Sequence, residues 1–295
     1  MKYMQKQKGE RRVFKYSVTV PENIPEMTLQ SYASHAFPLL SGNALRNAFN
    51  KRDVKMNGVR AAKDELVQPG AEIVIFTPQE MLIPVVYEDD DVLLLNKPAG
   101  VSTDADKYNS MTVLDWAILY AKGAYTPRMC HRLDNATSGL ILLAKTDAAE
   151  EALIEMFRSR TGEKEYRCLV RGTPNPHKAV KTAYLQKDAL HGRVRVSDVT
   201  GRDAKQIVTE YEVLRPGEKC LLKVLLHTGR THQIRAHLRH LGHPLLGDDL
   251  YGDRTFNKKF GATRLMLCAV RLKIETGGKL PQLDGREFSI RAPFE

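Results

Sequence analysis

Apolar and polar residues follow two different spacings along this chain, and the dominant spacing changes near residue 80. Before that point, residues 28–40 and 44–49 carry apolar side chains at helical spacing, which predicts two short helices. An alternating segment then runs into Asn57-Gly58, a dipeptide typical of a tight turn between two strands. Residues 13–77 are therefore predicted to form a small compact domain, which follows a solvated basic tail over residues 1–12.

After a short linker at residues 78–82, apolar runs of strand length outnumber segments with helical spacing. The expected strands and helices do not alternate regularly, so an α+β fold is favoured over a doubly wound α/β fold. This second region, residues 83–295, is long enough to bury a core of its own. Strands are expected at residues 83–86, 92–95, 140–144, 166–170, 207–213 and 221–226, and helices at residues 112–122 and 148–160 and after His232.

The composition also bears on the partner of this protein, because basic residues are in excess. The 295 residues include 45 lysines and arginines against 35 acidic residues, which gives a formal net charge of +10. Such a surplus favours nucleic acid as a partner. Many proteins are basic without binding nucleic acid, so charge alone leaves both interpretations open.

The cysteines and the N-terminus bear on the cellular compartment. The four cysteines are dispersed, which argues against a zinc ribbon or a disulfide framework and fits a reducing compartment. The charged N-terminus has no apolar core of signal-peptide length, and no segment reaches the length of a membrane span. We therefore expect a cytoplasmic protein without membrane contact.

The most informative stretch is residues 131–145, where one carboxylate lies between cations and an apolar strand. Asp134 follows His131 and Arg132 and opens a polar turn rich in Asn, Thr, Ser and Gly. A lone aspartate cannot perform paired-carboxylate chemistry, but an aspartate kept ionised by a cation can act as a nucleophile. The apolar strand over residues 140–144 is expected to anchor the turn.

Two further segments carry candidate side chains that also have ordinary structural explanations. Lys97 ends an apolar strand at a Pro-Ala-Gly turn, so it either points into a cleft or simply closes the strand. Tyr166 shares a strand face with Cys168 and Val170, and it either meets a substrate or packs in the core. For Tyr166 taken alone, packing is the more common outcome.

A cation-rich segment over residues 226–240 predicts an anion-facing loop that opens a helix. Arg230 and Arg235 can each hold a carboxylate or a phosphate in two-pronged fashion. Histidines at positions 232, 237, 240 and 243 suggest a metal, but no His-Glu-x-x-His order is present and nearby arginines would repel a cation. No metal site is therefore predicted.

Together these segments closely resemble the RluA-type family of RNA pseudouridine synthases over residues 80–295. The likeness rests above all on His-Arg-Leu-Asp-x-x-Thr-Ser-Gly at residues 131–139 and Thr-Gly-Arg-x-His-Gln-Ile-Arg at residues 228–235. It implies a mixed, mostly antiparallel sheet with flanking helices and a central RNA cleft, and it implies no cofactor. Two departures, Cys268 where many members carry His and Asn135-Ala136 in place of a charged pair, remove no residue that the chemistry requires.

Residues 13–77 resemble the small α-L RNA-binding module of the ribosomal small-subunit protein S-four, which is a known neighbour of this catalytic domain. A helix opening at Ser41-Gly42 and the turns at Asn57-Gly58 and Pro69-Gly70 carry the likeness. The family usually has Arg after the first Ser, so the Gly here is expected to weaken or re-aim the grip on RNA. Phosphate contacts are expected from Arg46, Lys51, Arg52 and Lys55.

The resemblance also implies roles for the catalytic candidates. Asp134 is expected to act as the nucleophile or to stabilise a sugar intermediate, with Arg235 as its charge partner and Tyr166 as the proton-transfer group. Arg132 is expected to fill the space that the flipped uridine leaves. RNA contacts are expected from His131, Arg230 and Lys97, and walls of the base pocket from Ile234 and Leu265.

The expected function is the isomerisation of specific uridines in structured RNA by a monomer. The domain arrangement favours large-subunit ribosomal RNA or ribosome precursor particles as the target. A transfer-RNA pseudouridine synthase and a non-catalytic ribosome-assembly factor are the alternatives. An aspartate-nucleophile hydrolase would need a second acid or base, which the motif lacks.

Overall fold

The computed structural model describes residues 13–188 and 192–295, so the predicted basic tail lies outside it. Within the described residues, one compact unit holds residues 13–84 and 100–127, and a second holds residues 85–99 and 128–295. No helix in these described ranges is long and apolar enough to cross a membrane.

The first unit extends beyond the predicted module because residues 100–127 pack with it. The Tyr32 hydroxyl donates to the Tyr108 carbonyl at 3.0 Å, and the Trp116 indole donates to the Met81 carbonyl at 3.0 Å. Contacts between residues so far apart in the sequence cannot be predicted from the spacing of apolar residues along the chain. One boundary between the units, after Pro84, thus lies close to the linker expected at residues 78–82, and residues 100–127 return to the first unit.

The local elements of the first unit follow the predicted pattern. Asn57 and Gly58 both have positive φ (50° and 79°), as a two-residue hairpin turn requires. The first helix is shorter than expected, because Pro38 disfavours helical backbone at Phe37. A four-stranded sheet has the order β1 (Phe14–Thr19), β4 (Glu72–Thr77), β2 (Val54–Met56), β3 (Val59–Arg60), and the helices are α1 (Leu29–Ala36), α2 (Gly42–Asn50) and α3 (Val113–Ala121).

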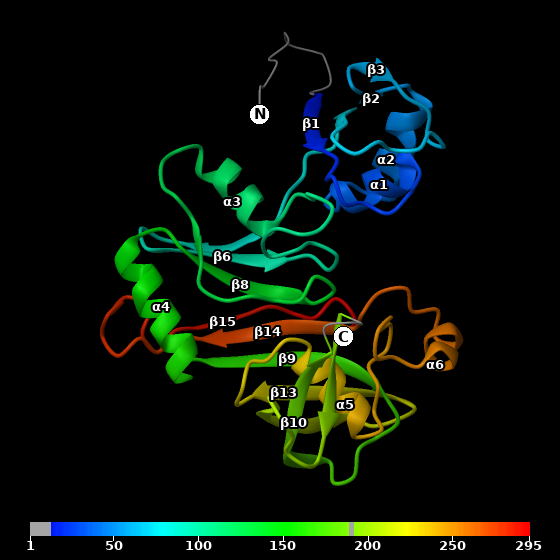
Figure 1. Ribbon diagram of the computed structural model, residues 1–295. Helices are drawn as coiled ribbons and strands as arrows, with labels where there is room; N and C mark the ends of the chain where they lie inside the picture. Colours follow the sequence, from blue (N-terminus) through cyan, green and yellow to red (C-terminus); the bar gives the residue numbers. More distant parts are fainter. Residues whose placement is uncertain (1–12, 189–191) are drawn as a thin grey trace. The chain divides into compact units, whose positions relative to one another are not determined.

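An eleven-stranded sheet forms the second unit (Figure 1). Its order is β11-β10-β12-β13-β9-β14-β8-β6-β5, with β15 beside β14 and β7 beside β8. Only the β14–β8 pair is parallel among the strand pairs of the described residues, so the expected mixed, mostly antiparallel α+β architecture is confirmed. The strands are β5 (Val85–Glu88), β6 (Val92–Lys97), β7 (Arg128–Met129), β8 (Ser138–Ala144), β9 (Glu163–Arg171), β10 (Lys178–Asp188), β11 (Arg193–Ser197), β12 (Lys205–Arg215), β13 (Lys219–Leu226), β14 (Leu267–Lys273) and β15 (Glu287–Ser289).

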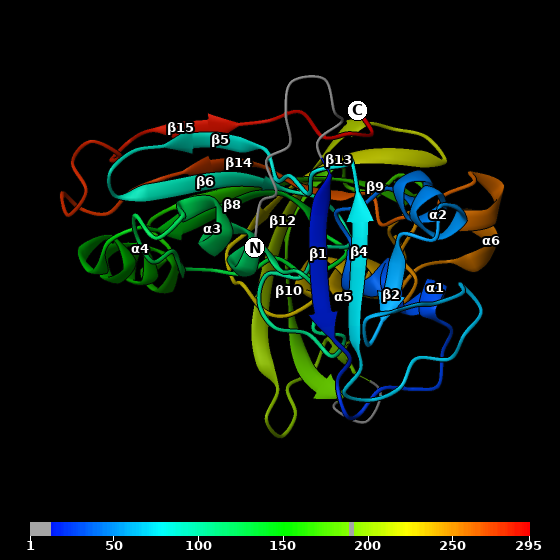
Figure 2. The same cartoon turned by 90° about the horizontal axis from the view of Figure 1, so that it is seen from above.

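Helices α4 (Asp147–Ser159), α5 (Gln233–His240) and α6 (Arg254–Lys259) belong to this second unit. Figure 2 shows α4 alongside β6 and β8, where Leu153 packs with the fully buried Leu94 and Leu142. Burial of each such leucine contributes about 2 kcal/mol. Helix α5 packs against β10 and β12 through Ala236, and this contact fixes the helix that carries Arg235.

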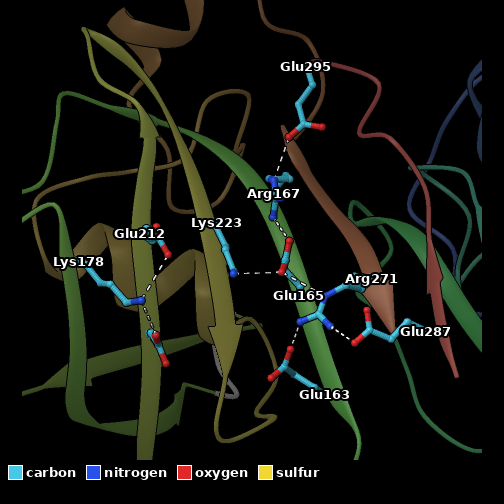
Figure 3. Close-up of polar contacts among 10 residues, drawn as sticks. Glu163, Glu165, Arg167, Lys178, Glu212, Lys223, Arg271, Glu287 and Glu295 are labelled. Carbon is cyan, nitrogen blue, oxygen red and sulfur yellow. Dashed lines mark hydrogen bonds and ion pairs between the residues drawn. The ribbon is translucent and has the colours of Figure 1, made fainter. Parts of the chain in front are cut away.

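One face of β9 carries a network of charged side chains (Figure 3). Glu165 is 5% exposed and lies 3.3 Å from Arg271 Nε and 3.5 Å from Lys223 Nζ, and it also pairs with Arg167. Arg271 in turn reaches Glu287 on β15 at 2.9 Å. A carboxylate this deeply buried is tolerated because several cations surround it. The network therefore ties β9 to β13, β14 and β15.

Candidate active site

The turn that carries Asp134 is held against β14 by a glycine. The Thr137 amide donates to the Asp134 carbonyl at 3.0 Å, and β8 begins directly afterwards. Gly139 has a φ of +114°, and a Cβ at this position would lie 2.2 Å from the Ala269 carbonyl oxygen. Only glycine therefore allows β8 and β14 to approach here as a parallel pair.

Asp134 faces the arginine that the sequence assigned to it, but that arginine has a stronger partner. Arg235 Nη1 lies 4.0 Å from Asp134 Oδ2. The same guanidinium donates two hydrogen bonds to Asp248, Nε to Oδ2 and Nη2 to Oδ1, both at 2.8 Å. The Asp134 side chain is 24% exposed, whereas those of Arg235 and Asp248 are buried. Arg235 is thus a fixed cation at the edge of an accessible carboxylate.

The Asp248 carboxylate is the principal functional group that sequence reasoning missed. Burial opposes its ionisation, but the hydrogen bonds and charge of Arg235 outweigh burial and lower the pKa of Asp248. Asp248 also accepts hydrogen bonds from the amides of Leu250 and Tyr251, each at 2.9 Å. Nothing in the residue spacing reveals a pairing between Arg235 and Asp248 across 13 positions.

Tyr166 lies on β9 and is 5% exposed. Burial, and then the negative charge of Asp134, raise the pKa of the Tyr166 phenol, so it stays protonated at neutral pH. A phenol in this state can donate a hydrogen bond but is a weak proton acceptor.

Lys97 is fully buried, which corrects the expectation that it contacts RNA. Its ammonium donates to the carbonyls of Pro98 and Asn135, both at 3.1 Å. Burial lowers the pKa of Lys97 to about 7, with Asp134 acting in the opposite direction. The side chain therefore supports the Asp134 turn from below instead of meeting a phosphate.

His131 is half-buried, and its ring makes contacts inside the second unit. Its Nε2 accepts a hydrogen bond from the Leu142 amide at 3.0 Å, and its ring lies 4.4 Å from the Phe157 ring. Burial, and then the charge of Lys164, hold the pKa of His131 well below its usual range. Nε2 is therefore engaged inside the unit, and the contact of His131 with RNA stays a prediction.

The loop before α5 is organised by a glutamine and a strained histidine. The Gln233 amide accepts from Thr228 Oγ1 at 2.8 Å and from the Arg230 amide at 3.1 Å, and it donates to β12. His232 has a φ of 55°, a conformation that non-glycine residues adopt mainly at special sites. Its Nδ1 lies 2.9 Å from the Tyr251 hydroxyl. The sequence had marked neither His232 nor Tyr251 as a site residue.

Some of the remaining predicted site residues are exposed, and others are buried or half-buried. Arg132 and Arg230 are exposed in the second unit, while Ile234 and Leu265 are buried there, at 4% and 6% exposure. In the first unit, the residues expected to contact phosphates lie in the middle of α2, directly after its end, and in β2. Arg46, Lys51 and Arg52 are exposed, and Lys55 is half-buried with its ammonium 5.7 Å from the centre of the Phe76 ring.

Comparison with known proteins identifies the protein family to which this chain belongs. A family model described as RNA pseudouridylate synthase matches residues 91–240. An uncharacterized RNA pseudouridine synthase of Aquifex aeolicus is 32% identical over 77% of this chain and 77% of its own length. The ribosomal large subunit pseudouridine synthase C of Escherichia coli is 34% identical over 82% of this chain and 76% of its own length.

Solved structures agree with this relationship. Human RNA pseudouridylate synthase domain containing 1 is 30% identical with a TM-score of 0.60, covering 72% of this chain and 85% of that one. Human RNA pseudouridylate synthase domain containing 4, at 24% identity and a TM-score of 0.58, shares the fold over 71% of this chain and 88% of its own. The chain belongs to the RNA pseudouridylate synthase family.

Proposed function

We propose that this enzyme isomerises uridines in large-subunit ribosomal RNA, with Asp134 as the essential catalytic carboxylate. The observation that carries the proposal is the pairing of an accessible Asp134 with the buried Arg235, which Asp248 locks in place. The similarity to a relative named for the ribosomal large subunit supports the choice of target.

The reaction needs only rearrangement within one nucleotide. The bond from ribose carbon 1′ to uracil nitrogen 1 breaks, and carbon 1′ joins carbon 5 of the rotated base. Nitrogen 1 gains a proton and carbon 5 loses one, so atoms and oxidation state balance. Asp134 acts on the sugar, either by attack at carbon 1′ or by stabilising a sugar intermediate, and in both cases the guanidinium of Arg235 lies beside it, at 4.0 Å.

Base flipping brings the uridine to these groups. Arg132 is exposed two residues before Asp134, where it can occupy the space that the base leaves. Tyr166 packs against the uracil and, as a protonated phenol, donates rather than accepts in the first proton transfer. Ile234 and Leu265 supply apolar walls, and Arg230 contacts the RNA backbone. Since the catalytic groups all come from one chain, we propose that a monomer is active.

The N-terminal module is proposed to hold RNA without reading the target base. Arg46 is exposed in the middle of α2, and Lys51 and Arg52 are exposed directly after its end; phosphate attraction by such side chains does not depend on sequence. Two helices followed by the Asn57-Gly58 hairpin support the proposal of an S-four-like module.

Release of tritium from uracil carbon 5 tests the proposal. The labelled substrates are large-subunit ribosomal RNA, either free or in precursor particles, and total transfer RNA. The proposal predicts stoichiometric release from defined uridines of the ribosomal substrate. Release from transfer RNA alone would overturn the target, and binding without release from either substrate would make the chain a non-catalytic RNA-binding factor.

A further inference from the structure

The hydrogen-bond ladder of β8 is interrupted next to the catalytic turn. One edge of β8 pairs with β6 from Gly139 to Ala144. The other edge is shared between two strands, because β14 pairs only with Ser138 and Gly139 and β7 pairs only with Leu143 and Ala144. Residues 140–142 therefore lie between the end of one neighbour and the beginning of the other.

A histidine side chain fills part of this gap. The Leu142 amide, which lies at the shared edge, donates to His131 Nε2 at 3.0 Å. The imidazole thus takes the place of a strand carbonyl and spares this amide the cost of being buried without an acceptor. His131 reaches this site from the segment that leads directly into Asp134.

We propose that His131 is a positioning residue, whose neutral imidazole fastens the entry of the Asp134 turn to β8. This inference rests on the proposed function, since its effect is read through turnover. The turn is then held on both sides: His131 anchors the chain before Asp134, and Lys97 and Thr137 hold it afterwards.

The surroundings of His131 keep it in the required protonation state. Because Nε2 accepts the Leu142 hydrogen bond, the ring proton must lie on Nδ1, which is buried without a hydrogen-bond partner among the described residues. Phe157 from α4 packs on the ring, and Lys164 from β9 is the charged group that faces it, with its ammonium 4.5 Å from the centre of the Phe157 ring. Burial and this cation both disfavour the imidazolium.

Protonation and positioning therefore exclude each other. An imidazolium would present an N–H at Nε2 to the Leu142 N–H, so the hydrogen bond would be lost. Since the pKa of His131 is held well below its ordinary value of 6.5, this loss occurs only as the pH falls well below that value. The turnover number should then fall on an acid limb while RNA affinity changes little.

Substitutions at two positions test the proposal in full-length enzyme. His131→Gln retains an oxygen acceptor at a similar reach and should keep turnover within a few-fold of the wild-type value. His131→Leu removes the acceptor and should lower kcat by at least about 10-fold at unchanged RNA affinity, because small displacements of a catalytic group have large effects. The Leu142 amide should also exchange with deuterium faster in His131→Leu than in His131→Gln.

Changing the charge of Lys164 separates positioning by a neutral His131 from a purely structural role of His131. A purely structural role would leave the pH dependence of kcat unchanged. Lys164→Gln should shift the acid limb of kcat toward higher pH, because the imidazolium loses a repelling neighbour. In the His131→Gln background the same change should produce no shift. If His131→Leu does not fold, this double-variant comparison decides the question alone.

Failure of this inference is distinct from failure of the proposed function. An inactive wild-type enzyme would overturn the isomerase proposal. An active wild type in which His131→Leu turns over normally, or in which Lys164→Gln shifts the acid limb equally with and without His131, would overturn the positioning role.

Discussion

Tyr166 shows how burial sets the chemistry of a single side chain. It lies on β9 at 5% exposure, and burial and the charge of Asp134 raise the pKa of its phenol. In the proposed reaction such a phenol donates its proton and packs its flat ring against the uracil. These two contributions can be separated, because phenylalanine keeps the face and loses the proton.

Tyr166→Phe should lower kcat by about 100-fold or more while the dissociation constant for RNA stays within about 3-fold. The measurement is single-turnover tritium release together with filter binding on the same RNA. An equal loss in turnover and binding would reduce Tyr166 to a packing residue.

Lys97 and His131 mark the limit of sequence reasoning at this scale. Both are basic residue types near the candidate carboxylate, and the family resemblance implied RNA contacts for them. The structure instead places Lys97 under the turn and His131 in the gap of β8. Side-chain depth depends on strands far away in the sequence, so spacing alone could not reveal it.

At the scale of elements, the ion pair between α5 and the segment after it holds Arg235 in place. Removing the Asp248 charge would leave Arg235 buried and only partly compensated. Asp248→Asn should therefore lower the free energy of unfolding by about 3–5 kcal/mol and greatly reduce turnover.

Asp249 provides the matched control for this substitution. Its carboxylate lies 3.3 Å from the same guanidinium, but its side chain is 90% exposed. Asp249→Asn should change stability by less than about 1 kcal/mol, as is usual for exposed ion pairs. Denaturant unfolding measures the free energy of unfolding of both variants. Similar losses of stability in the two would contradict the role given to Asp248.

The charge network of β9 gives a second prediction for an element. Glu165→Gln removes the buried carboxylate that Arg167, Lys223 and Arg271 share (Figure 3), and it should destabilise the sheet by more than about 2 kcal/mol.

Glu212→Gln is the corresponding change in an exposed pair, with Lys178 at 3.5 Å, and should be nearly neutral. Thermal unfolding of Glu165→Gln and Glu212→Gln compares the stability of the two variants. A neutral Glu165→Gln would show that the network does not stabilise β9.

Two strong apolar runs were predictable, whereas the apolar strand β14 and the polar-faced strands β10 and β11 were not among the expected strands. The runs at residues 92–95 and 140–144 became β6 and β8, which are buried on both faces. β10 and β11 were missed because their exposed faces carry charged and polar residues that conceal the alternation. The shared edge of β8 could not be predicted, since it depends on where β7 and β14 end.

At the scale of the whole molecule, the net charge of +10 should dominate RNA affinity. Affinity should fall by about 10-fold or more between roughly 50 and 200 mM salt, because bound phosphates release counterions. A combined Arg46→Gln, Lys51→Gln and Arg52→Gln variant should show a shallower salt slope. Arg158→Gln on α4, where Arg158 pairs with Glu155, serves as control and should leave the slope unchanged. A salt-independent affinity would contradict the phosphate-binding role.

The role of Asp134 is the central claim, and one substitution tests it most directly. Asp134→Asn keeps the size of the side chain and removes its charge, so RNA should bind with near wild-type affinity. The measurement is tritium release from uracil carbon 5 of large-subunit ribosomal RNA, with wild-type enzyme in parallel. The account predicts release by the wild type and none by Asp134→Asn, and appreciable release by the variant would contradict it.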